Sequence, residues 1–160
     1  MAFLQAVIDG LLIGGVYAVI SIGLTLVYGV MGIINFAQAE FLMVGMLVAW
    51  FAWAMLGLDP VLAAPLSFAV AFVIGWFVQG QLISRVLKAP SVAQIFLTVG
   101  LLIVIENSAL LAFGSQFRSV TTWYQTVSLS LGPLFVSVPY LIAFAMSLAC
   151  GVALWWFMRT

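Results

Sequence analysis

The stretch GVMGIINFAQAEFLMVG, residues 29–45, places an amide and a carboxylate between two long apolar segments. Both Asn35 and Glu40 are costly to bury in hydrocarbon, so the fold must satisfy them or a function must require them. Gly29 and Gly32 follow a segment that reads as a helix, and glycine permits backbone angles that other residues resist. We therefore predict a broken or re-entrant helix across residues 29–40.

Two interpretations of this break remain open. With Asn35 as the N-cap of the next helix, Gln38 takes the third helical position and Glu40 lies close enough to the helix N-terminus to gain from its dipole. The polar groups would then be purely structural. Alternatively, the break has a function, because irregular backbone at membrane depth is tolerated only inside protein or beside a watery cavity, and transporters place binding sites there.

The composition is that of an integral membrane protein. Hydrophobic residues make up 67% of the 160 residues and charged residues 5%, with four acidic residues, four basic residues and no histidine. Water-soluble proteins carry roughly 25% charged residues, so this chain could not build a soluble surface. Transmembrane β-strands alternate over segments of about ten residues, whereas the long runs here are apolar on every face, which indicates an all-α fold.

Charge-free runs near or above the roughly 17–25 residues of a spanning helix predict an all-α, polytopic membrane helix bundle. About five transmembrane helices are expected, over residues 6–30, 36–56, 61–83, 92–113 and 140–158. Residues 1–160 are expected to form a single transmembrane domain. Before the last span, Val127, Leu129 and Leu131 alternate with serines, which leaves a short external hairpin and an irregular loop as alternatives.

The distribution of cations predicts the orientation of the chain. The connector LISRVLKAPS, within residues 82–91, holds the paired cations Arg85 and Lys88, so the positive-inside rule places loop 84–91 in the cytoplasm. Counting crossings from that loop puts the N-terminus, Asp59 and the Arg118 loop outside. The C-terminal end with Arg159 is then cytoplasmic.

A second intramembrane polar pair, Glu106 with Asn107, lies near the middle of the fourth predicted span. An ionisable group at that depth is a functional-site hypothesis by default, because it cannot easily reach the interface. The structural alternative is a partner amide, such as that of Asn35 or Gln94. The residues alone leave both interpretations open.

Small residues form a smooth face on the first span. Gly10, Gly14 and Ala18 recur every four residues, with Gly15 and Gly23 on the adjacent row. Such spacing lets another helix approach closely, and ordinary packing within one bundle is favoured over a dedicated dimer motif. The glycines that we assign to helix packing or to the helix break are Gly10, Gly14, Gly23, Gly29, Gly32 and Gly45.

Several functions are excluded by what the sequence does not contain. No phosphate-binding GxxxxGK[ST] loop is present, so the chain does not hydrolyse ATP by that route. No histidine, no Cys/His cluster and no nucleophile with a neighbouring base appears, which argues against a membrane enzyme and against a metal site or other cofactor. Nucleic-acid binding would require a basic patch that this chain lacks.

The run GLLIGGVYAVISIGLTLVYGVMGIINFAQAEFLMVG, residues 10–45, resembles the opening signature of the branched-chain amino-acid ABC transporter permeases. A second run, LTVGLLIVIENSALLAFGSQFRSV at residues 97–120, is similar to the fourth-span pattern of that family. The positions of the first run that match are Gly10, Gly14, Tyr17, Ala18, Gly23, Leu24, Leu26, Gly29, Val30, Asn35, Phe36, Ala37, Glu40, Phe41, Met43 and Gly45.

Two features depart from the family pattern. Gln38 and Ala39 stand where the family usually has His-Gly, so a neutral amide replaces a titratable imidazole and proton-linked transport is not implied. Members of the family are also nearly twice as long as this chain. The chain therefore resembles the amino-terminal portion of such a permease, without the cytoplasmic loop that contacts the ATPase.

The resemblance implies a permease subunit of the bacterial inner membrane that works by alternating access. Its expected partners are a second permease subunit, two ABC ATPase subunits and a periplasmic binding protein that delivers branched-chain amino acids. The residues expected to line the translocation path are Tyr17, Asn35, Glu40, Glu106 and Asn107. Two rival interpretations remain, an ATP-independent channel or facilitator for a small polar solute such as urea, and a truncated membrane fragment without transport activity.

Overall fold

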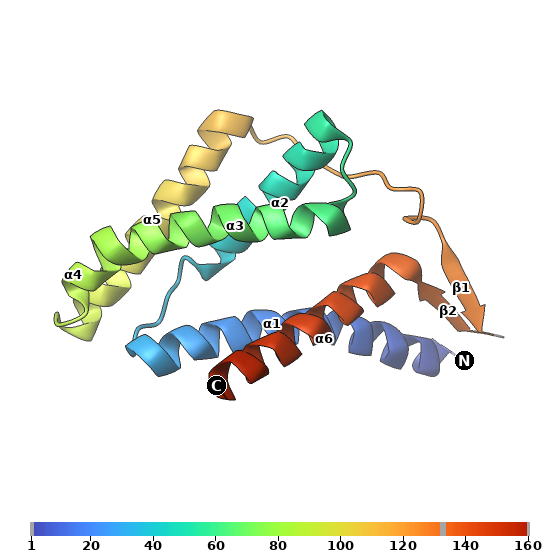
Figure 1. The fold of residues 1–160 in the computed structure, drawn as a ribbon, viewed down its shortest axis with the longest axis horizontal. Coiled ribbons are helices and arrows are strands. Elements are labelled where there is room, and N and C mark those ends of the chain that lie inside the picture. Colours follow the sequence, from blue (N-terminus) through green and yellow to red (C-terminus); the bar gives the residue numbers. More distant parts are fainter. Residues whose placement is uncertain (1, 132–133, 160) are drawn as a thin grey trace. The chain divides into compact units, whose positions relative to one another are not determined.

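The computed structural model describes residues 2–131 and 134–159 (Figure 1). The predicted domain boundaries, Met1 and Thr160, lie outside the described residues. Val27–Val120 forms one compact unit, and a second compact unit combines the chain up to Leu26 with the chain from Thr121 onward. Each unit is described by itself below.

The prediction of an all-α membrane bundle is confirmed, since five helices among the described residues are long and apolar enough to cross a membrane. They are α1 (Ala2–Met31), α2 (Gln38–Leu56), α3 (Pro60–Val78), α5 (Ser91–Phe113) and α6 (Val138–Arg159). The third span runs on through a π-helical turn, η1 (Gln79–Ile83), and the short α4 (Ser84–Val86), three residues beyond its predicted end. Their large apolar side chains point outward, as Leu111 at 89% exposure illustrates, which suits helices that face lipid.

A tight turn joins α2 to α3 in the unit Val27–Val120. Gly57 ends α2 in the left-handed conformation with a φ of 65°, and its N–H donates to the Trp53 carbonyl at 3.0 Å. The Asp59 carboxylate then accepts from the Val61 N–H at 2.9 Å and caps α3, while Pro60 takes the first helical position. A connection this short makes the two helices antiparallel neighbours.

The connector between α4 and α5 is held by one amide. The Gln94 side-chain nitrogen donates to the carbonyls of Val86, Leu87 and Ala89 at 3.2, 3.3 and 3.1 Å. The Val86 carbonyl at the end of α4 also accepts from the Ala89 N–H at 2.9 Å, and carbonyls at a helix C-terminus lack partners within the helix. Gln94 therefore fixes the connector that carries Lys88, one of the predicted cytoplasmic cations.

The other unit contains a β-hairpin, which settles the alternative that the sequence left open. Strand β1 (Ser128–Leu131) pairs antiparallel with β2 (Leu134–Ser137). The Gln5 side chain of α1 binds the edge of β2 at both groups of Phe135, donating to its carbonyl at 2.6 Å and accepting from its N–H at 3.0 Å. The first turn of α1 and the start of α6 therefore lie at the same end of this unit.

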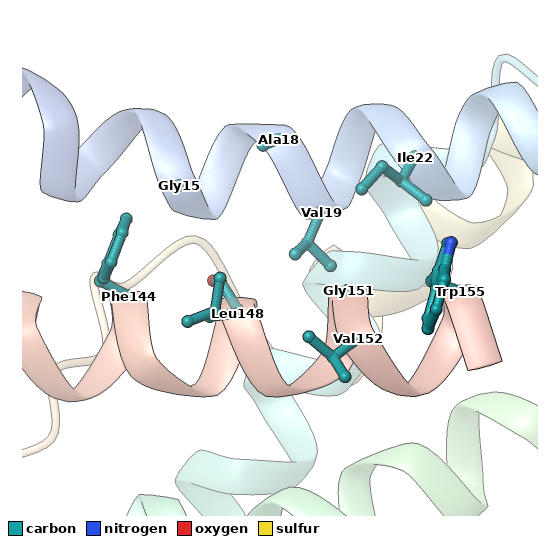
Figure 2. A pocket seen from close by; sticks show the side chains of 10 residues that line it. Gly15, Ala18, Val19, Ile22, Phe144, Leu148, Gly151, Val152 and Trp155 are labelled. Atoms are coloured by element: carbon teal, nitrogen blue, oxygen red, sulfur yellow. The ribbon is translucent and has the colours of Figure 1, made fainter.

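Helices α1 and α6 run in the same direction. Gly15 faces Phe144, and Ile22 lies with Val152 and Trp155 farther along, so the numbers rise together on both helices (Figure 2). A first and a fifth crossing must share a direction. The packing of this unit therefore agrees with the count of five crossings made from the sequence.

Candidate functional site

The predicted helix break is confirmed between α1 and α2. Helix α1 ends at Met31, and Gly32 follows in the left-handed conformation with a φ of 68°, its N–H donating to the Tyr28 carbonyl at 2.8 Å. A residue with a Cβ would be strained at that angle, which explains the glycine. Residues 32–37 are not helical, and α2 begins at Gln38.

The predicted capping arrangement is wrong by two residues. The N-cap of α2 is Ala37, which offers no side-chain hydrogen bond, rather than Asn35. Asn35 instead accepts from the Ala37 N–H at 3.1 Å and closes a local turn, and the Ala37 carbonyl accepts from the N–H groups of Glu40 and Phe41 at 3.1 and 3.3 Å. Gln38 is consequently the first helical residue rather than the third, and the Glu40 carboxylate lies half-buried in the first turn.

Two residues of the break are anchored in the protein core. Ile33 and Ala37 are 2% and 0% exposed and pack with Val78, Ile83 and Leu101 in the core of the unit Val27–Val120. Ile34 and Phe36, which lie between them, are 47% and 44% exposed, so the core holds the segment at two points without enclosing it. Helix α1 and helix α2 therefore present their ends to each other across a segment that the core holds in place.

Thr98 is the residue that sequence reasoning missed. Its side chain is 1% exposed on α5, and its hydroxyl lies 3.3 Å from the Ile34 carbonyl in the break and 3.1 Å from the Ile95 carbonyl of its own helix. Thr98 thus ties the irregular segment to α5. The only signal in the sequence was a lone hydroxyl in an apolar run, and threonines in membrane helices commonly bond to their own backbone.

Replacing Thr98 with valine should loosen the break while leaving the helices intact. Valine keeps the side-chain shape but removes the donor, so the carbonyl of the half-exposed Ile34 loses a hydrogen bond whose net worth is about 0.5–1.5 kcal/mol. Hydrogen exchange at the amides of residues 32–38 should speed up by up to roughly tenfold, as a cost of about 1.4 kcal/mol implies. Thr98→Ser, which retains the hydroxyl, is the matched control. Unchanged exchange in the valine variant would show that the hydroxyl does not hold the segment.

The second polar pair lies on α5 of the same unit. Both Glu106 and Asn107 are exposed, and the Asn107 side chain donates to the Ile103 carbonyl one turn earlier at 2.8 Å. Neither proposed partner amide is directed at Glu106: Gln94 binds the α4–α5 connector, and Asn35 accepts from Ala37. Glu106 instead lines a groove that it shares with Trp50 and Arg118.

The structure brings four of the five predicted path residues into one unit, with Asn35 and Glu40 at the break and the Glu106–Asn107 pair on α5. Tyr17 belongs to the other unit, where it is 65% exposed on α1. Its backbone carbonyl accepts from the Ser21 hydroxyl at 2.9 Å. That these five residues line a path stays a prediction.

The close approach between helices occurs at Gly15 rather than on the Gly10–Gly14 row. A Cβ at Gly15 would overlap the ring of Phe144, whereas a Cβ at Gly10 or Gly14 would meet no heavy atom within 4 Å in the described residues. The same holds for Gly29 and Gly45 within that part of the chain. Gly23 lies half-buried on α1. A partner helix on the Gly10–Gly14 row stays a prediction.

No group of three His, Cys, Asp or Glu residues that could hold a metal ion occurs within residues 2–131 and 134–159.

Five apolar helices, with a core-anchored break between the first two, define a multi-pass membrane protein. The chain belongs to the family described as the branched-chain amino acid transport system permease component, whose family model matches residues 6–160.

Individual relatives agree with this family. The chain is 34% identical over 128 residues to the high-affinity branched-chain amino acid transport system permease protein BraD of Pseudomonas aeruginosa, covering 75% of this chain and 42% of BraD. It is 34% identical over 122 residues to the permease protein LivH of Escherichia coli K12, covering 71% of this chain and 40% of LivH. The matches thus span about two fifths of each relative. No solved structure matches the chain.

Proposed function

We propose that the chain forms the membrane-spanning permease portion of an ABC importer for branched-chain amino acids or related amino acids and amides. The observation that carries this proposal is the match of residues 6–160 to the permease component family, supported by relatives whose names state this transport. The chain itself performs no catalysis. ATP hydrolysis resides on partner ATPase subunits, and residues 1–160 act as one transmembrane domain of the permease.

Transport proceeds by alternating access. ATP binding and hydrolysis in the partners rock the helices so that a central path opens to one side and then to the other. The break between α1 and α2 supports this role, because a short irregular segment can absorb changes in backbone angle that an intact helix resists. Asn35 and Glu40 at the break, with Tyr17, Glu106 and Asn107, line or shape the path.

The partners are a second permease subunit, two ABC ATPase subunits and a periplasmic binding protein. The chain resides in the bacterial inner membrane with its N-terminus outside and with loop 84–91 and the C-terminal end in the cytoplasm. Single cysteines placed in a Cys150→Ala background test this orientation. Leu87→Cys should label from the cytoplasmic side and Asp59→Cys from outside, and the reverse pattern would overturn it.

Import of leucine by the assembled transporter tests the proposed function. Uptake should stop when the ATPase subunits are inactivated, because the permease has no energy source of its own. Uptake that persists would identify an ATP-independent facilitator instead. If residues 1–160 and a version extended to the length of BraD both fail to import leucine with every partner present, the transport assignment itself is wrong.

A further inference from the structure

A groove of about 500 Å³ lies in the unit Val27–Val120, between α2, α5 and the segment that follows α5. Sites for small molecules commonly measure about 300–1,000 Å³ and have apolar walls with a few polar groups. The wall is lined by Met43, Met46, Leu47, Leu110, Phe113 and Phe117. Its polar members are Glu106, Gln116 and Arg118, so the composition is that of a site for a small amphipathic molecule.

Arg118 is held in place at this groove. Its guanidinium carbon lies 4.2 Å from the centre of the Trp50 ring, and its Nη2 donates to the Phe113 carbonyl at 2.6 Å. That carbonyl belongs to the last turn of α5, where the helix dipole favours a cation. A guanidinium has five N–H donors in a planar fork that suits a carboxylate, and this contact uses one of them.

The groove's carboxylate comes from another turn of the same helix. Glu106 precedes Phe113, whose carbonyl holds Arg118, by seven residues on α5, which is about 10 Å along a helix that rises 1.5 Å per residue. The wall of the groove therefore carries one anionic and one cationic side chain, which come from different positions along the groove.

We propose that this groove is a binding station for a zwitterionic aliphatic amino acid, with Arg118 pairing with its carboxylate. The aliphatic side chain lies against Trp50, Leu47 and Leu110, and Glu106 offers the next polar contact, for the ammonium group. This inference rests on the proposed function, because it assigns a site on the permease to the amino acid that the transporter imports. An acyl chain is a poorer occupant, because a lipid tail would lie beside the Glu106 carboxylate.

Protection of a single cysteine tests the station directly. Ala109→Cys, in a Cys150→Ala background, places a thiol on the groove wall with little added volume. In the assembled transporter in lipid nanodiscs, millimolar leucine should slow its reaction with a maleimide at least fivefold. Leucinamide, which lacks the carboxylate, should not slow it. Arg118→Gln should abolish the protection by leucine.

Arg159→Gln is the matched control, because Arg159 also lies over a tryptophan, at 5.2 Å from the ring of Trp155, but lines no part of this groove. It should leave the protection intact. Protection that survives Arg118→Gln, or equal protection by leucinamide, would overturn the role of Arg118.

Import in the same preparation separates this inference from the proposed function. Leucine import without protection of the cysteine would overturn the station and leave the proposed function standing. Protection without any import would support the station and contradict the proposed function. A thiol that reacts only after anionic lipid is removed would identify a lipid as the occupant and overturn the proposal.

Discussion

Gly15→Val is expected to cause a large loss of stability, and Gly14→Val is expected to cost far less. A Cβ at Gly15 would lie 2.6 Å from Cε2 of Phe144 and closer still to Cδ2, so the ring or the helices must move. Overpacking of this kind typically costs about 1–3 kcal/mol, and domains are stable by only about 5–15 kcal/mol. The yield of folded protein extracted from the membrane and its midpoint of thermal unfolding measure the effect.

Gly14 is the natural control because it is adjacent in sequence and a Cβ there would meet no heavy atom within 4 Å among the described residues. Both variants introduce the same β-branched residue into the same helix, so differences in helix propensity cancel. Adding Phe144→Ala to Gly15→Val should restore part of the stability, since the clashing ring is gone. Equal losses from Gly14→Val and Gly15→Val would show that contact with α6 is not what constrains this face.

The spans and the break could be predicted because their causes are local. A helix that crosses hydrocarbon needs about 20 apolar residues in succession, and a charge-free run reveals that requirement directly. Gly32 and Asn35 likewise indicated the break from their own chemistry. Glycine permits backbone angles that other residues resist, and asparagine tends to close turns. Neither inference depended on which residues of other helices lie nearby.

The remaining features depend on contacts between distant residues. Nothing near Thr98 in the sequence shows that the Ile34 carbonyl, 64 residues away, lies beside it. Gly14 and Gly15 are equally small, and only the position of Phe144 on α6 decides which of the two another helix approaches. The N-cap of α2 was predicted wrongly for a different reason. An asparagine side chain can either cap a helix or close a local turn, and Asn35 closes a turn with the Ala37 N–H.

Glu40→Ala should reduce transport by at least tenfold while the amount of folded protein changes little. Glu40 lies in the first turn of α2, next to the break, and the N-cap of this helix supplies no side-chain hydrogen bond. The favourable interaction of a carboxylate with a helix N-terminus is worth about 0.3–1 kcal/mol. A loss of that size leaves a protein of ordinary stability folded, so a much larger loss of transport must reflect a functional role.

Asp59→Ala provides the matched comparison, because Asp59 is also a carboxylate at a helix N-terminus, where it accepts from the Val61 N–H at 2.9 Å. Removing that cap should cost about 1 kcal/mol and leave transport per folded molecule near the wild-type value. Initial rates of leucine uptake, divided by the amount of folded permease in the membrane, compare the two variants. If Glu40→Ala lowers uptake only in proportion to folded protein, as expected for Asp59→Ala, the carboxylate stabilises the helix end and the translocation path must be sought away from the break.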